Sequence, residues 1–187
     1  MEEIQHRHCS GVTLFELMIV LAIVSVLVTI VAPNVSSIVA KHRMIAELND
    51  LSGAIRFARF NAVDQQLSTA LCPSHNFSNC DFNNWNLPKI VFTDLNHNNL
   101  RDADEALLHS TSMVHNTIKM KGPKKSIRFY GDGVVSSPAT VTFCPKQKRP
   151  KLNRALVVSL QGRIRTSKDT NNDEIHEVRK GKPVECL

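Results

Sequence analysis

The fold is decided by the stretch Gly11-Val12-Thr13-Leu14-Phe15-Glu16-Leu17-Met18-Ile19-Val20-Leu21-Ala22-Ile23-Val24. An apolar run starts directly after Gly11, and Glu16 is the one charged residue near its beginning. Residues 17–40 contain no Asp, Glu, Lys or Arg, and residues 17–32 are apolar except for Ser25 and Thr29. Because about 20 apolar helical residues cross a bilayer, residues 12–35 are predicted to form a membrane-spanning helix.

The position of the cleavage site predicts that this helix stays on the mature protein. A secretory signal has small residues after its apolar core, where it is cleaved. Here the plausible processing site, between Gly11 and Val12, lies before the core, so residues 1–11 are predicted to be a leader. Cleavage there would expose the amine of Val12 four residues before Glu16. A lone carboxylate near the membrane core is costly and usually functional; the alternative is a passive charge at the start of the helix.

This amino-terminal pattern resembles the type III signal of type IV pilins and type II secretion pseudopilins. The resemblance implies that prepilin peptidase cleaves after Gly11 and that Val12 becomes the N-methylated amino terminus. It also implies that Glu16 pairs with the amine of a neighbouring pilin subunit during assembly. Val12 stands where Phe is usual and Phe15 where Ile is common, but both keep these positions apolar. Pro33 falls where many pilins carry a helix-loosening proline.

The same resemblance implies a location and a topology. We expect a single-pass protein of the inner membrane, with its head in the periplasm, that is assembled into an extracellular pilus.

Residues 36–70 are predicted to continue as an amphipathic helix. Their apolar residues recur at spacings of three and four, which places on one stripe Leu48, Leu51, Ile55, Ala58, Ala62 and Val63. After residue 71, short β-like runs alternate with turns. Strands are expected at 89–93, 105–108, 117–120, 126–130, 140–144, 155–160 and 163–166. A helix followed by strands predicts an α+β fold, in which an antiparallel sheet of the β-rich head (residues 71–187) packs on the stripe.

Several later segments resemble the FimT/GspH group of minor pilins. They are Leu71-Cys72-Pro73-Ser74 with Cys80, Trp85, residues 90–94, residues 102–105 with Leu107-Leu108, and Gly162-Arg163-Ile164-Arg165, which is similar to the G-R-x-R segment of that group. The resemblance implies the type IV pilin fold. It further implies DNA capture by a competence pilus, with Arg163 and Arg165 as the main ligands.

Charge is spread unevenly along the chain. Residues 12–118 hold six Lys and Arg against nine Asp and Glu, whereas residues 119–187 hold sixteen against six, so that the net charges are −3 and +10. A carboxy-terminal part this basic is expected to meet a polyanionic partner or surface.

The pair Arg163 and Arg165 suits phosphates. On an extended strand both side chains point the same way, about 7 Å apart, and a guanidinium fork can hold phosphate bidentately. Gly162 allows the chain to bend there. The patch is expected to include Lys168, Arg179, Lys180 and Lys182, and to be widened by Lys146, Lys148, Arg149 and Lys151. Since no base-reading element is evident, binding to duplex DNA should be sequence-independent and salt-sensitive. The alternative is a solvated face, or a contact with a neighbouring subunit.

Cysteine usage agrees with export. Cys9 lies in the leader, and the remaining four cysteines allow three disulfide connectivities. We favour Cys72–Cys80, which closes a short loop, together with Cys144–Cys186, which ties the chain end to a strand. A metal site formed by Cys72, His75 and Cys80 is the competing interpretation, but its spacing matches no common zinc pattern.

One polar segment has the spacing of a calcium loop. The residues that occupy positions 1, 3, 5, 9 and 12 of an EF-hand-like loop are Asp94, Asn96, Asn98, Asp102 and Glu105. Asn99 replaces the expected glycine, and both flanks are β-like rather than helical. The favoured interpretation is therefore an Asx-rich hairpin whose side chains cap their own backbone, with calcium as the alternative. No cofactor is predicted.

The sequence is compatible with three function classes to different degrees. The favoured one is a minor type IV pilin that binds extracellular DNA for natural transformation. The second is a minor pseudopilin of a type II secretion system, whose basic face would contact partner subunits. An enzyme is disfavoured, because no nucleophile–base pair, phosphate loop or paired carboxylates stand out and the eight histidines are scattered.

Overall fold

The computed structural model describes residues 11–186, except for the side chains of residues 30–34. The predicted leader, apart from Gly11, therefore lies outside the described residues. So does the side chain of Pro33, whose backbone belongs to a helix. The chain divides into two compact units, Met1–Val39 and Ala40–Leu187, and each is described by itself. The second unit is called the head below.

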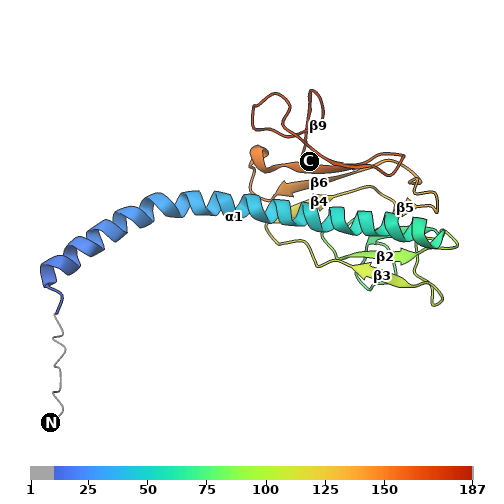
Figure 1. Ribbon diagram of the computed structural model, residues 1–187, viewed down its shortest axis with the longest axis horizontal. Coiled ribbons are helices and arrows are strands. Elements are labelled where there is room, and N and C mark those ends of the chain that lie inside the picture. Colours follow the sequence, from blue (N-terminus) through green and yellow to red (C-terminus); the bar gives the residue numbers. More distant parts are fainter. Residues whose placement is uncertain (1–10, 187) are drawn as a thin grey trace, which may run out of the picture. The chain divides into compact units, whose positions relative to one another are not determined.

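Helix α1 (Leu14–Gln65) begins where the sequence predicted a helix. The Thr13 hydroxyl accepts a hydrogen bond from the backbone N–H of Glu16, which is the N-cap arrangement that satisfies a free amide of the first turn. In the first unit the large apolar side chains of α1 from Leu14 to Val28 are exposed. Figure 1 draws this amino-terminal part of α1 in blue. The hydroxyls of Ser25 and Thr29 donate to the carbonyls of Ala22 and Val26, so the helix itself satisfies them.

Among the described residues, no helix combines the length and the apolar character that crossing a membrane requires.

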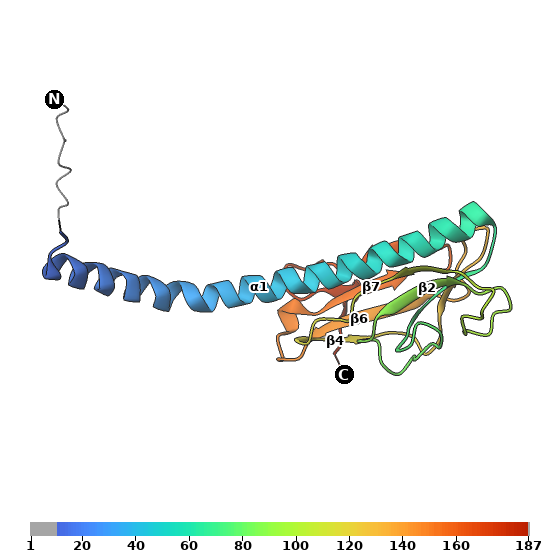
Figure 2. The ribbon, with the colours of Figure 1, turned by 90° about the horizontal axis from the view of Figure 1, so that it is seen from below.

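The apolar stripe of α1 in the head agrees with the predicted stripe. Its buried residues include Met44, Leu48, Leu51, Ile55, Ala58 and Ala62, again three or four positions apart. Val63, which the sequence placed on the stripe, is 43% exposed instead. In Figure 2 this part of α1 runs along strands of the head.

The helix ends at Gln65, before the predicted end at residue 70, so the prediction of a helix over 36–70 was wrong at its last turn. Gln66 has a φ of 55°, in the left-handed region that ends a helix, and its side-chain amide donates to the carbonyls of Val63 and Gly131. Residues Thr69–Pro73 then form strand β1, which is buried throughout between two other strands. Pairing with these strands outweighs the weak helical preference of the segment.

Instead of the single sheet that was expected, the described residues form two four-stranded antiparallel sheets. The first has the order β3-β2-β1-β5, with β2 at Lys89–Thr93, β3 at Leu107–Ser110 and β5 at Ile127–Phe129. The second has the order β4-β6-β7-β8, with β4 at Ile118–Lys121, β6 at Ala139–Pro145, β7 at Arg154–Val158 and β8 at Ile164–Thr166.

Each predicted strand overlaps an observed one, but three strands were missed: β1 and the hairpin of β9 (Glu177–Arg179) and β10 (Lys182–Pro183). The strand expected at 105–108 begins only at Leu107. Before it, the Glu105 carboxylate accepts hydrogen bonds from the amides of Leu95 and Asp102, which holds Glu105 in the preceding loop. A short 3-10 helix, η1 (Pro150–Leu152), links β6 to β7.

Both sheets and the stripe of α1 share one apolar core. A continuous cluster of buried side chains includes Ile55 of α1, Val91 and Phe129 of the first sheet, and Phe143 and Leu156 of the second. The α+β fold, with a long helix packed on antiparallel strands, is therefore confirmed.

Candidate nucleic-acid interface

The turn between β7 and β8 positions the predicted DNA ligands. Gly162 has a φ of +71°, and a Cβ atom placed on it would lie 2.4 Å from the carbonyl oxygen of Gly133 and 2.8 Å from Nε of Arg59. The amide of Gly162 donates to the carbonyl of Ser159, and the amide of Ser159 donates to the carbonyl of Arg163, both over 2.9 Å. Only glycine fits this turn without strain or collision.

Arg59 of α1 anchors the same turn. Its Nε donates to the carbonyl of Gly133 (3.1 Å) and its Nη2 to the carbonyl of Gln161 (3.2 Å). The guanidinium therefore bridges α1, the β5–β6 connection and the turn before Gly162. This role could not be predicted from the sequence, because the partners lie 74 and 102 residues away and no local signal connects them.

Arg163 and Arg165 are both exposed, and Ile164 between them packs against the core. They line two separate hollows rather than one. Arg163 lies beside Arg56 and Phe60 of α1, whereas Arg165 shares its hollow with Arg179 and Lys182 of the β9–β10 hairpin. Nη1 of Arg165 donates to the carbonyl of Val178, which connects β8 to β9.

Two more of the predicted patch residues lie at the hairpin or before it. Lys168 is exposed and its backbone pairs with that of Glu177 in β9, and Lys180 is exposed in the turn before Gly181. Lys151 forms an ion pair with Glu174, so its charge is matched within the head.

The register of the second sheet places further cations on the face of Arg165. Arg165 lies opposite Val157, which lies opposite Thr140, and directly opposed residues point to the same face of a sheet. On β4, Ile118 and Met120 are buried while Lys119 and Lys121 are exposed, opposite Cys144 and Thr142. This outer face therefore has two lysines on one edge strand and Arg165 on the other.

Both predicted disulfides are present. Cys144–Cys186 joins β6 to the carboxy-terminal segment, and the buried side-chain amide of Asn153 donates to the carbonyl of Val184. These contacts fix the basic tail against the second sheet. Because Cys72 and Cys80 form the other disulfide, neither is a thiolate that could bind zinc.

The segment with calcium-loop spacing uses its carboxylates internally. Nη2 of Arg128 lies 2.6 Å from Oδ2 of Asp94, and the amides of Asn96 and Asn98 donate to Asp102. Asn99, which stands where the loop would have glycine, has a φ of 63° in the left-handed region. These contacts favour the hairpin interpretation over calcium. Across the described part of the chain, no group of three or more His, Cys, Asp or Glu residues could hold a metal ion.

Comparison with known protein families decides the membership of the chain. The sequence matches the family described as "Type II transport protein GspH" over residues 47–162, more than half of its length. The chain belongs to this family. A prokaryotic N-terminal methylation motif matches residues 6–32. The protein is thus a minor pilin or pseudopilin of the FimT/GspH family, which is structural rather than enzymatic, as expected from the sequence. The motif implies processing by prepilin peptidase and partners among other pilin subunits.

A solved minor pilin structure has a similar fold. The type IV minor pilin FimU of Pseudomonas aeruginosa is 17% identical, with a TM-score of 0.54 over 68% of this chain and 90% of that one. The minor pseudopilin EpsH from the Type 2 Secretion System of Vibrio cholerae is 11% identical, with a TM-score of 0.45 over 65% of this chain and 94% of that one. A search of curated proteins found no match. At these identities the similarity to FimU supports the pilin fold alone.

Proposed function

We propose that this protein is a minor type IV pilin, similar to FimT, that is incorporated in a pilus and binds extracellular duplex DNA for natural transformation. The observation that carries the proposal is the gathering of cations around the second sheet. Arg165, Arg179 and Lys182 line one hollow, and Lys119 and Lys121 are exposed on the same face of the sheet as Arg165. The net charge of +10 over residues 119–187 supports it.

The chemistry of this surface suits the sugar–phosphate backbone. Lysine and arginine bind phosphates through charge-assisted hydrogen bonds and release condensed counterions, so affinity falls as salt rises. The backbone is the same at every base pair, and contacts with it carry no sequence information. We therefore assign Gly162, Arg163, Arg165, Lys168, Arg179, Lys180 and Lys182 to sequence-independent DNA binding.

The amino terminus would connect this surface to a filament. Cleavage between Gly11 and Val12 would leave residues 12–35 as the anchor in the inner membrane and place the head in the periplasm. Glu16 would pair with the N-methylated amine of the next subunit. The two disulfides support a periplasmic head, since disulfides persist in oxidising compartments.

Binding of a fluorescent non-specific duplex to the full chain in detergent, measured over a series of salt concentrations, tests the proposal. Arg163→Gln with Arg165→Gln should weaken binding of all sequences alike and reduce the salt dependence by roughly one charge per arginine. The matched control is Lys124→Gln with Lys125→Gln, which removes the same charge from two exposed lysines that line neither hollow. Unchanged binding by the arginine variant would reject the site, and no binding by the wild type at low salt would reject the function.

A second candidate function is a minor pseudopilin of a type II secretion system, in which the basic surface contacts partner subunits. The family match, described as a type II transport protein, favours it. Absence of DNA binding, together with co-purification of the chain with pseudopilins through Arg163 and Arg165, would establish this alternative.

A further inference from the structure

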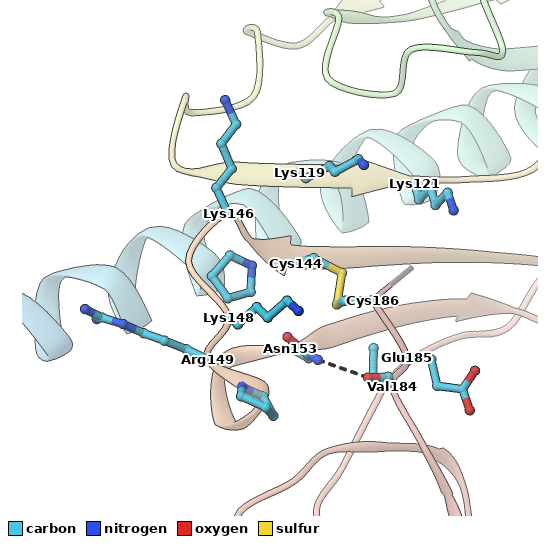
Figure 3. A pocket seen from close by; sticks show the side chains of 12 residues that line it. Lys119, Lys121, Cys144, Lys146, Lys148, Arg149, Asn153, Val184, Glu185 and Cys186 are labelled. Carbon is cyan, nitrogen blue, oxygen red and sulfur yellow. Dashed lines mark hydrogen bonds between the residues drawn. A yellow bond between two sulfur atoms is a disulfide. The ribbon is translucent and has the colours of Figure 1, made fainter.

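A third basic hollow lies around the Cys144–Cys186 disulfide. It measures about 590 Å³, within the usual range for ligand sites. Five cations line it, and a single acid does: Lys119, Lys121, Lys146, Lys148, Arg149 and Glu185. In the view of Figure 3 the disulfide lies between Lys119 and Lys121 on one side and Lys148 and Asn153 on the other.

The backbone around this hollow is held from several directions. The amide of Lys146 donates to the carbonyl of Thr117 over 2.9 Å, which fixes the start of the β6–β7 connection beside β4. On the opposite wall, the amide of Val184 donates to the carbonyl of His176, and the carbonyl of Val184 accepts from Asn153. The disulfide then joins this wall to β6, next to Lys119, since Cys144 is the register partner of Lys119. The cations therefore project from a backbone that these hydrogen bonds and the disulfide already hold in place.

Several of these cations have no ion-pair partner among the described residues. Within residues 11–186, neither of the ion pairs Arg128–Asp94 and Lys151–Glu174 includes Lys119, Lys146, Lys148 or Arg149. Lys146 and Lys148 are exposed and their side chains make no hydrogen bond to the described residues. Like charges kept this close repel one another, and an anion of several charges placed among them would relieve the repulsion.

We propose that this hollow is a phosphate-binding site, distinct from Arg163 and Arg165, that holds consecutive phosphates of one DNA strand. The assignment of DNA as the occupant rests on the proposed function. Lysine acts as a flexible point charge, which suits a row of phosphates of variable spacing better than a single planar anion. The site adds a second anchor for the duplex on the head, at the edge strand β4, whereas Arg165 lies on the opposite edge strand β8.

Titration calorimetry with tripolyphosphate, as a probe of consecutive phosphates, tests the hollow itself on the full chain in detergent at low salt. We expect one probe per chain, and an affinity about tenfold lower for Lys146→Gln with Lys148→Gln. Lys146→Arg with Lys148→Arg should retain binding, and the control Lys124→Gln with Lys125→Gln should leave it unchanged. Fluorescence of the buried Trp85 checks that each variant is folded. No binding, or an equal loss in the control, would overturn the site.

The duplex assay then separates this inference from the proposed function. If the hollow holds DNA, Lys146→Gln with Lys148→Gln should lower duplex affinity and reduce the salt dependence by roughly two charges. If that variant binds DNA normally while the Arg163 and Arg165 variant does not, the inference fails and the proposed function stands. If the wild type binds no DNA, the proposed function fails, and with it the assignment of DNA as the occupant.

Discussion

At the scale of single residues, the first sheet buries charges that the sequence gives little reason to expect inside. The side chain of Asp94 is completely buried and that of Arg128 is 12% exposed, and the two form an ion pair. Lys89, the first residue of the inner strand β2, is 2% exposed and its Nζ donates to the carbonyl of Leu87. Such groups are stable only with their partners in place, so each offers a sharp test of the structure.

Replacing Asp94 with Asn should destabilise the head by about 3–5 kcal/mol, because it leaves the guanidinium of Arg128 without its counter-charge. Urea unfolding followed by Trp85 fluorescence measures the change. The control Asp104→Asn alters an exposed carboxylate of the same loop and should have little effect. Combining Asp94→Leu with Arg128→Met should recover much of the loss. If Asp94→Asn is neutral, the ion pair does not hold the loop.

Lys89 should make stability depend on pH. Burial lowers the pKa of Lys89 from 10.5 to about 8, while the charges of Glu47 and Asp50 oppose the fall. Between pH 8 and 10.5 the unfolded chain therefore holds a proton that the folded chain has released. The free energy of unfolding should rise across this range by about 3 kcal/mol relative to Lys89→Met, which has no such proton. If the free energy of unfolding changed with pH in the same way in both proteins, the burial of the Lys89 amine would be contradicted.

At the scale of elements, the turn between β7 and β8 depends on a close approach to α1 and to the β5–β6 connection. Gly162 and Gly181 both have a positive φ, but a Cβ atom at Gly181 would meet nothing within 4 Å. Gly162→Ala should therefore cost about 1–3 kcal/mol more than Gly181→Ala, the difference being the collision with the Gly133 carbonyl and Arg59. Thermal unfolding of the two variants measures it. If both substitutions reduced stability equally, the close approach of the turn to the Gly133 carbonyl and Arg59 would be contradicted.

At this scale, the sequence predicted the features that depend on residues close together in the chain. The stripe of α1 and most strands follow from spacings of two, three and four residues, and a limited number of cysteine pairings left Cys144–Cys186 as a plausible choice. Strand β1 was missed because Leu67-Ser68-Thr69-Ala70 is equally compatible with a last helical turn, and only its neighbours β2 and β5 make it a strand.

The candidate sites also depend on contacts between distant segments, which the sequence does not reveal. The charge count indicated a basic region, but not that Lys119 and Lys121 would meet Lys146 and Lys148 around a disulfide. Nor could it show that Arg163 and Arg165 line separate hollows. These placements depend on strand register, which contacts between distant segments set.

At the scale of the whole molecule, processing decides what reaches the filament. Mass spectrometry of the membrane-purified protein should give a chain that begins at Val12 and carries one methyl group on its amine. Gly11→Val should prevent this cleavage without disturbing the fold, because a Cβ atom at Gly11 would meet nothing within 4 Å. A start at Met1, or cleavage near Ala32, would refute the assignment of the leader.

The core that α1 shares with both sheets determines how cooperatively the head unfolds. Since Phe129 and Phe143 belong to one cluster although they lie in different sheets, neither sheet can lose its packing and leave the other intact. Slow amides of β1 and β7 should then exchange with deuterium through the same global opening and report one free energy. A destabilising substitution at Asp94 would thus also destabilise the distant basic strands. Such a variant can therefore lose affinity for a polyanion although none of the residues that contact the polyanion has changed.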